Sequence, residues 1–254
     1  MPEGDVVWYT ARRLHEALAG RTLTRSDFRV PRLATADLTG DKVTEAAARG
    51  KHLLIRTSGG LTVHTHLLMD GSWRVTPASS AVTESHRIRL ILANDEWQAT
   101  GYQLGVVELL RTRDEQRATG HLGPDLLGPD WDRDEAVRRL VAQPDRPVGE
   151  ALMDQRNLAG IGNVYKSEVL FMRRVNPWTP AGAVPDLAEL TDVAHQLLDA
   201  NKARVGRITT GSPRRGEETW VYGRRGRPCR RCGTAIQAQG QQDRVTYWCP
   251  RCQS

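Results

Sequence analysis

The four cysteines constrain the fold of this chain more than any other feature. They form two CxxC pairs, Cys229 with Cys232 and Cys249 with Cys252, and sixteen residues separate the pairs. Four thiolates at this spacing are typical of a closed tetrahedral zinc site; a redox-active pair is the alternative, which the second matched pair disfavours. We therefore predict one structural Zn²⁺ that holds a β-hairpin and, with no open coordination position, takes no part in catalysis.

Basic residues flank the predicted finger, and the whole chain carries a net charge of +6. Five arginines lie just before and within the first cysteine pair: Arg224, Arg225, Arg227, Arg230 and Arg231. The hairpin would project residues 241–244 at its tip, where Arg244 is either a solvated charge or a contact to a phosphate or base. Because a basic surface suits a polyanion, the neighbouring arginines favour nucleic acid as the partner.

Composition places the chain among soluble globular proteins. It has 254 residues, enough for one large or two ordinary domains, with 39% hydrophobic and 26% charged residues. No apolar run approaches the length of a membrane span, and no secretory h-region follows the start. We expect a cytoplasmic protein that does not bind a membrane, and cysteines in that compartment favour a metal over disulfides.

Hydrophobic periodicity indicates one helix followed by many short strands. Residues 5–20 carry apolar side chains at helical spacing and end at Gly20, a natural helix stop. Strand-like segments separated by turn residues follow at 23–30, 53–55, 61–63, 73–75, 88–92 and 106–110. This order predicts a β-sandwich or barrel-like domain up to about residue 115.

The pattern changes after residue 119. Residues 120–132 are rich in Gly, Pro and Asp, which is typical of a linker. Helical patterns follow at 136–141, 148–154, 163–174 and 187–198. The expected fold is therefore α+β, with an N-terminal domain over residues 1–118, a helical domain over 131–222 and the zinc-finger hairpin over 223–254.

The first five residues, Met1-Pro2-Glu3-Gly4-Asp5, contain a possible catalytic group. Removal of Met1 would leave Pro2 as a terminal secondary amine, which can attack an electrophilic sugar carbon and form an iminium. Glu3 is a possible proton shuttle, and Asp5 can cap the helix that follows. Taken alone, this stretch is better explained as a polar start before a helix.

Three other stretches each have a functional and an ordinary structural explanation. Residues 158–163 form a Gly-bearing turn into a helix, where Asn163 is a phosphate ligand, a cap, or part of an ordinary helix–turn–helix corner. Lys51 is either solvent-facing or reaches a backbone phosphate. Leu68 and Met69 are either core residues or an exposed wedge that fills the gap left by an extruded base.

The histidine pair His64 and His66 and the carboxylate of Glu168 are expected to have structural roles. His64 and His66 share one face of a predicted strand, and no third ligand lies at useful spacing. Hydrogen-bonding or core histidines are therefore favoured over a metal site. Glu168, one turn into the helix after Asn163, is expected to stabilise the fold.

Taken together, these motifs resemble the formamidopyrimidine-DNA glycosylase/endonuclease VIII family of base-excision repair enzymes. They run in family order from the first residue to the last, so the resemblance covers the whole chain. The matching stretches are residues 1–5, 49–53, 158–163 with Tyr165 and Glu168, 221–224, and the four-cysteine finger that ends at residues 249–253. The resemblance makes Pro2 an expected catalyst.

The resemblance implies an N-terminal β-sandwich that carries the first helix, and a C-terminal helix–two-turn–helix domain with the zinc finger. It implies that Pro2 displaces the damaged base and forms a Schiff base at C1′, that Glu3 transfers protons, and that β- and δ-elimination nick the strand. Phosphate-holding or DNA-binding roles fall on the following residues: Lys51, Gly162, Asn163, Tyr222 and Arg244. The implied partner is double-stranded DNA containing oxidised bases or abasic sites, bound by a monomer.

Departures from the family pattern narrow the expected substrate. Where the oxidised-purine branch has an Asp-Pro-Arg-Arg-Phe-Gly-like segment, residues 101–105 lack both the Arg pair and the Phe. The loop over residues 209–218 is also short for the cap that encloses an oxidised purine. Leu68 and Met69 fall where the endonuclease VIII branch places its wedge, so oxidised pyrimidines are expected.

Four other functions are compatible with part of the sequence. A catalytically silent family member, or a module that binds damaged DNA without cleaving it, would need no free Pro2 amine. An oxidised-purine glycosylase would share the chemistry. A structural zinc-ribbon protein would explain the finger and the charge, but it would leave the matches at Pro2, Lys51 and residues 158–163 as coincidences.

Overall fold

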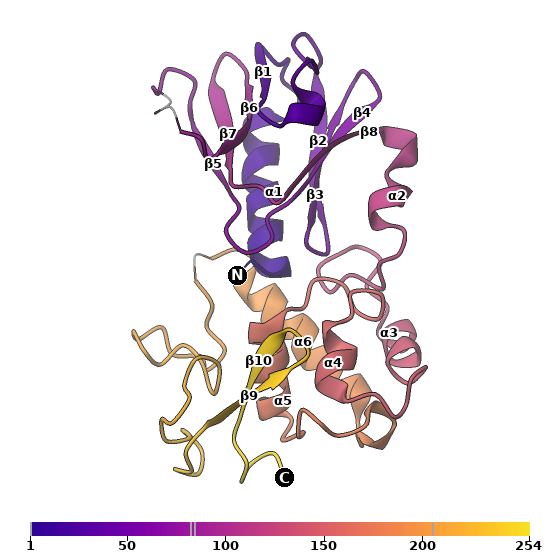
Figure 1. The fold of residues 1–254 in the computed structure, drawn as a ribbon, viewed down its shortest axis with the longest axis vertical. Helices are drawn as coiled ribbons and strands as arrows, with labels where there is room; N and C mark the ends of the chain where they lie inside the picture. The colour runs from indigo at the N-terminus through magenta and orange to yellow at the C-terminus, as the bar shows by residue number, and fades with distance from the viewer. Residues whose placement is uncertain (1, 82, 84, 205) are drawn as a thin grey trace. The chain divides into compact units, whose positions relative to one another are not determined.

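The computed structural model describes residues 2–81, 83, 85–204 and 206–254. The chain divides into two compact units, residues 1–121 and 122–254 (Figure 1). Each unit has a hydrophobic core of its own. No helix of the described ranges combines the length and the apolar composition that a bilayer crossing requires.

The first unit contains two four-stranded antiparallel sheets (Figure 1). One sheet has the order β1-β6-β7-β5, with β1 at Arg25–Phe28, β5 at Ser72–Pro77, β6 at Ile88–Ala93 and β7 at Trp97–Tyr102. The other has the order β2-β3-β4-β8, with β2 at Val43–Arg49, β3 at His52–Thr57, β4 at Leu61–His66 and β8 at Val106–Arg111. The sheets share one core, which makes this unit a β-sandwich.

Helix α1 (Gly4–Leu18) contributes one apolar stripe to that core. Val7, Leu14 and Leu18 are buried together with side chains of both sheets, such as Ile55 and Leu92. The predicted helix over residues 5–20 is confirmed. The unit also contains two 3₁₀ turns and a one-turn helix: η1 (Pro31–Leu33), η2 (Thr112–Asp114) and α2 (Gln116–Thr119).

Two of the eight strands described for this unit were not predicted from the sequence. Strand β2 contains three consecutive alanines and a glutamate, which favour helix in isolation. Strand β7 contains Gly101, which weakens the strand signal. In both cases pairing with a neighbouring strand overrides local propensity, because β2 pairs with β3 and β7 pairs with β5 and β6.

The second unit begins with helices packed around one core. The helices are α3 (Arg133–Leu140), α4 (Val148–Met153), α5 (Asn163–Met172), η3 (Ala181–Ala183) and α6 (Leu187–Asn201). Every residue of α5 except Met172 is buried, so this helix runs through the centre of the unit. The four predicted helical segments are confirmed, and Pro147 occupies the N-cap of α4.

A two-stranded hairpin completes the second unit. It is formed by β9 (Gln237–Gln241) and β10 (Arg244–Trp248), with residues 242 and 243 as its turn. A small cluster that includes Phe171, Val221 and Ile236 joins the hairpin region to α5. The predicted α+β class, a sandwich followed by a helical part and a four-cysteine hairpin, is confirmed.

Candidate active site and nucleic-acid interface

Pro2 and Glu3 directly precede α1, the helix whose apolar stripe packs into the sandwich core. Pro2 is half-buried, and Glu3 is completely buried as the N-cap residue, with its carbonyl oxygen accepting from the Val7 amide at 3.1 Å. The prediction that Asp5 caps α1 is wrong, because the helix begins one residue earlier, at Gly4. Asp5 lies in the first turn, where a carboxylate still interacts favourably with the helix dipole.

Lys51 lies in a tight turn between two paired strands. Arg49 and His52 are directly opposite each other in the β2–β3 ladder, so Gly50 and Lys51 form a two-residue hairpin turn. Gly50 has φ of 57°, in the left-handed region that glycine adopts without strain. The turn leaves the Lys51 side chain partly accessible at the end of the second sheet.

A directed hydrogen-bond chain follows Lys51 on the same sheet. His64 Nδ1 lies 2.9 Å from Glu108 Oε2, and His64 Nε2 lies 2.8 Å from His52 Nδ1. An ionised carboxylate only accepts, so His64 Nδ1 donates to Glu108; in the neutral tautomer of His64 that this requires, Nε2 accepts from His52 Nδ1. Burial, followed by the charge of neighbouring histidines, lowers the pKa of His52 to about 3. The expectation of hydrogen-bonding histidines agrees with these two contacts.

The turn after β4 exposes two large apolar side chains. Leu68 and Met69 are 50% and 49% exposed, which excludes the alternative that they belong to the core. Leu68 has φ of 52°, and its amide donates to His66 Nδ1 at 2.9 Å. Together with Arg89 and Gln103, among others, these residues line an open pocket of about 440 Å³. A leucine in the left-handed region is a strained conformation that the surrounding contacts must hold.

In the second unit, the turn into α5 directs Asn163 toward the hairpin. Gly162 is the N-cap residue and makes no side-chain cap, so the possibility that Asn163 caps α5 is wrong. The Asn163 amide Nδ2 instead donates to the Val245 carbonyl at 2.8 Å. Its Oδ1 is buried, with no hydrogen-bond partner among the described residues. One Nδ2 hydrogen therefore remains for a further acceptor.

Glu168 fixes a second segment onto the same helix. Its carboxylate accepts from the backbone amides of Trp220, Val221 and Tyr222 at 2.7, 2.9 and 2.8 Å, and from the Thr209 hydroxyl. Burial raises the pKa of Glu168, and the four donors act against that effect. The expected structural role of Glu168 agrees with these contacts, which hold the segment that carries Tyr222.

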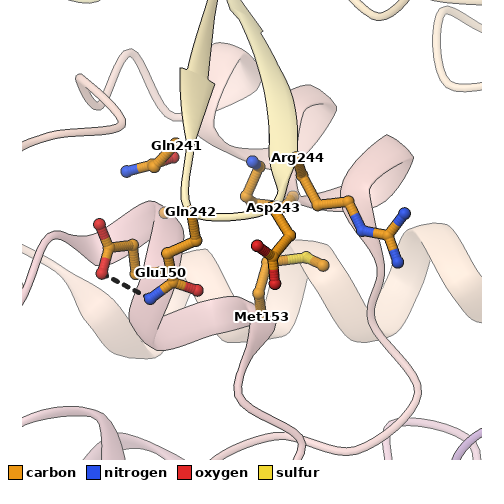
Figure 2. Close-up of a pocket in the computed structure, with 8 residues that line it drawn as sticks. Glu150, Met153, Gln241, Gln242, Asp243 and Arg244 are labelled. Carbon is orange, nitrogen blue, oxygen red and sulfur yellow. Dashed lines mark hydrogen bonds between the residues drawn. The ribbon is translucent and has the colours of Figure 1, made fainter.

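The hairpin brings the remaining basic candidate into the same region. The Tyr222 ring lies edge-on to Tyr247 of β10, with centroids 5.1 Å apart. Arg244 begins β10 and is exposed, and its side chain extends away from Gln241 on the opposite strand (Figure 2). Asn163 and Tyr222 therefore both contact strand β10, which begins with Arg244.

The polar groups that hold the hairpin were not predicted from the sequence. The structure adds Glu150, whose Oε2 accepts from Gln242 Nε2 at 2.7 Å, and a buried lysine, Lys166. These residues are far apart in sequence, and only the charged Lys166 inside an apolar helix could have indicated a buried polar contact.

The four cysteines come together as a metal-binding set. Their sulfur atoms lie within 4.8 Å of one another, near the ~3.8 Å separation that tetrahedral Zn–S bonds of ~2.3 Å give. Burial, followed by hydrogen bonding to Cys232, raises the pKa of Cys252 to about 12. A divalent cation would compensate the repulsion between the thiolates, so the donor set fits a structural metal ion.

The chain matches three family models that follow one another along it. They describe the formamidopyrimidine-DNA glycosylase N-terminal domain over residues 1–104, its H2TH domain over 122–210, and a zinc finger found in FPG and IleRS over 226–254. A protein of Streptomyces coelicolor named "Probable endonuclease 8 2" is 58% identical over all of this chain and 94% of its own length. The chain belongs to the formamidopyrimidine-DNA glycosylase/endonuclease VIII family.

Other members of the glycosylase/endonuclease VIII family support this assignment. A protein of Mycolicibacterium smegmatis named "DNA-(apurinic or apyrimidinic site) lyase Nei2" is 49% identical over all of this chain and 99% of its own length. A solved structure of MutM in complex with DNA containing carbocyclic 8-oxo-G has a TM-score of 0.84 and 25% identity, with both chains fully covered. The protein is thus a member of a family of DNA repair glycosylases and abasic-site lyases.

The candidate residues are divided between the two units. The first unit holds Pro2, Glu3, Lys51, Leu68 and Met69; the second holds Gly162, Asn163, Tyr222, Arg244 and the four cysteines. In this family context, the first group comprises the candidate reacting groups and wedge, and the second group comprises candidate DNA-binding and metal-binding residues.

Proposed function

We propose that the chain is a bifunctional DNA glycosylase and abasic-site lyase that removes oxidised bases, with pyrimidines preferred. The observation that carries this proposal is the start of α1, where a completely buried Glu3 carboxyl directly follows the half-buried Pro2. A secondary amine beside a proton-transfer group, at the start of a family member's catalytic domain, supports covalent catalysis.

The proposed reaction uses the Pro2 amine after Met1 is removed. The nitrogen attacks C1′ of the damaged nucleotide, the glycosidic bond breaks, and the base departs with a proton. Glu3 protonates O4′ as the sugar opens to the iminium. The iminium acidifies C2′–H, so loss of that proton expels the 3′-phosphate by β-elimination, and δ-elimination then expels the 5′-phosphate.

Proposed DNA contacts come from both units. Lys51 in the first unit, and Asn163 and Arg244 in the second, would hold phosphates around the extruded nucleotide, with Gly162 and Tyr222 beside them. Such contacts position the duplex without reading its sequence, and their affinity falls with salt. The remaining Nδ2 hydrogen of Asn163 and the exposed guanidinium of Arg244 are suitable donors.

The preference for pyrimidines rests on Leu68 and Met69. They are contiguous and exposed, as a wedge that replaces an extruded base must be. Residues 101–105 supply no Arg pair and no Phe for the arrangement expected of the oxidised-purine branch. We further propose that residues 1–118, 131–222 and 223–254 act as catalytic, helical DNA-binding and finger parts, with one structural Zn²⁺ held by the four cysteines of a monomer.

Borohydride trapping tests the chemistry. Protein whose mass shows Pro2 at the terminus is incubated with duplexes containing thymine glycol, dihydrouracil, 8-oxoguanine or an abasic site, and is then reduced. We expect a covalent protein–DNA band on abasic and oxidised-pyrimidine duplexes, because borohydride reduces the iminium to a stable amine.

Two variants serve as controls for the trapping experiment. Pro2→Gly removes the secondary amine and should give little product, and Glu3→Gln should bind abasic DNA but release little base. A missing band on every duplex, with Met1 shown to be absent, would favour a silent DNA-binding member. A strongest band on 8-oxoguanine would favour the oxidised-purine alternative.

A further inference from the structure

The hairpin that carries Arg244 is attached to α5 by a buried lysine. Lys166 is 1% exposed, and its Nζ lies 2.5 Å from Thr246 Oγ1 on β10. Burying an ammonium group is costly unless it is hydrogen-bonded, so its place at this contact calls for a specific role. The contact joins the centre of the helical core to the strand that begins with Arg244.

The hydrogen-bond chain continues from Thr246 across the hairpin. Thr246 Oγ1 donates to Gln241 Oε1 at 2.9 Å, and Gln241 Nε2 donates to the Pro177 carbonyl at 3.0 Å. The direction is fixed because an ammonium only donates and a carbonyl only accepts. Lys166, Thr246 and Gln241 are all buried, so water does not replace these bonds readily.

Gln241 lies directly opposite Arg244 in the ladder and also contacts α4. A Cβ atom added to Gly149 would lie 2.5 Å from Gln241 Oε1, so only glycine allows this close approach. One of the two turn residues is held separately, since Gln242 Nε2 donates to Glu150 (Figure 2). The hydrogen bonds from Lys166 through Thr246 therefore fix Gln241, the residue paired with Arg244. Glu150 of α4 holds the turn through Gln242.

Arg244 itself is exposed and lies at the edge of this framework. With Lys166, Glu150 and Gln241, among others, it lines a pocket of about 170 Å³ beside the hairpin tip (Figure 2). A two-stranded hairpin is only marginally stable in water without support. The direction in which Arg244 points consequently depends on the groups that anchor its strand.

We propose that Lys166 is a positioning residue for Arg244, acting through Thr246 and Gln241. The chain fixes the hairpin tip on α5, so that the guanidinium meets a DNA phosphate without first ordering its strand. This inference rests on the proposed role of Arg244 as a phosphate contact. Lys166 does not touch DNA in this account, and its effect reaches DNA only through the position of the hairpin.

The variants Lys166→Met and Thr246→Val test the chain, because each keeps side-chain volume and removes a hydrogen-bonding group. Thr246→Ser should rescue, since it retains the hydroxyl, and Lys42→Met, at an exposed lysine of the first unit, is the matched control. For cleavage of an abasic-site duplex we expect KM to rise on the order of tenfold and kcat to change little. Zinc content should be unchanged.

The salt dependence of binding separates positioning from general stability. With a duplex containing an uncleavable tetrahydrofuran site, Lys166→Met should lower the log–log salt slope by about 0.9, the value for one phosphate contact. In an Arg244→Ala background the same change should alter affinity less than about twofold, because coupled residues are not additive. Equal losses in both backgrounds would overturn the proposal.

Other outcomes also decide between the alternatives. If Lys166→Met fails to fold, the comparison of Thr246→Val with Thr246→Ser tests the proposal. Equal KM values and DNA affinities of these two variants would contradict positioning. Loss of zinc in every variant would show that the chain only stabilises the fold, and would also contradict it. If the wild-type protein binds the tetrahydrofuran duplex but cleaves no abasic site, the proposed function fails while the positioning of Arg244 is still measured.

Discussion

At the scale of single residues, burial in one cluster lowers the pKa values of two histidines of the second sheet. His52 and His66 lie on one end of the second sheet, near Lys51, His64 and His121. Burial, followed by nearby cationic or protonatable groups, lowers the pKa of His66 to about 4, as it lowers that of His52 to about 3. Both imidazoles are therefore neutral at neutral pH.

This cluster predicts acid sensitivity of the first unit. Because the folded pKa lies below the unfolded value of about 6.5, the unfolded state binds protons first, and stability is lost as pH falls from about 6.5 toward 4 and then 3. Each such histidine gives a slope of up to ~1.4 kcal/mol per pH unit. Urea unfolding between pH 4.5 and 7.5 should show a shallower slope for His52→Gln. The exposed control, His86→Gln, should keep the wild-type slope; identical slopes for both variants would contradict the assignment.

Because Leu68 is exposed and in the left-handed region, we predict that replacing it changes activity on duplex DNA but hardly changes the stability of the first unit. Asparagine tolerates positive φ, so the free energy of unfolding of Leu68→Asn should lie within ~0.5 kcal/mol of the wild-type value. Base excision from duplex DNA should fall at least about tenfold, because a short polar side chain cannot replace a stacked base. Cleavage of a single-stranded abasic site, which needs no wedge, should change little.

The control for that prediction is Val141→Asn, which removes another exposed apolar side chain, in the second unit. It should leave duplex and single-strand activities unchanged. Equal losses of duplex and single-strand activity in Leu68→Asn would indicate a role other than insertion into the base stack.

At the scale of secondary-structure elements, close packing fixes where the hairpin meets α4. Gly149→Ala should destabilise the second unit by ~1–3 kcal/mol, because the new methyl group meets Gln241 Oε1 and the Pro177 carbonyl. Better helix propensity returns at most ~1 kcal/mol. Gly240→Ala on β9, where a Cβ meets nothing within 4 Å, is the control and should be close to neutral in urea unfolding. A Gly149→Ala protein as stable as wild type would contradict this prediction, because it would show that Gln241 moves aside without cost.

Elements whose local sequence pattern matches their structure were predictable, and elements whose composition opposes it were not. Helix α1 follows from its apolar stripe, and the finger follows from cysteine spacing. Strand β2 was missed because its alanines favour helix and only its pairing with β3 makes it a strand. The Lys166–Thr246–Gln241 chain was missed for a related reason: the three residues meet through tertiary packing, which no local pattern encodes.

At the scale of the whole molecule, the two units have separate cores, so metal loss should be a local event. The cluster that includes Cys229, Cys249 and Phe171 belongs to the second unit alone. Structural metal sites couple ion binding to folding. Chelation of the ion, or Cys249→Ser, should therefore unfold the hairpin and leave the first unit folded.

Calorimetry and metal analysis check this prediction together. The wild-type protein should contain one Zn²⁺ per chain, and the Cys249→Ser protein should contain none. The unfolding transition of the first unit should persist at an unchanged temperature, while DNA binding is lost. Full zinc content in Cys249→Ser, or simultaneous loss of both transitions, would contradict local coupling.

The Glu168 carboxylate has a consequence for how this scaffold can be diversified. Both ends of the segment over residues 209–222 donate hydrogen bonds to that carboxylate, from the Thr209 hydroxyl and the Tyr222 amide. The Thr209 amide also donates to the Glu218 carbonyl at 2.8 Å. Loop length costs little once the ends are closed. The stretch between these anchors should therefore tolerate insertions, because a longer segment leaves both of its ends tied to Glu168 and helix α5 in place.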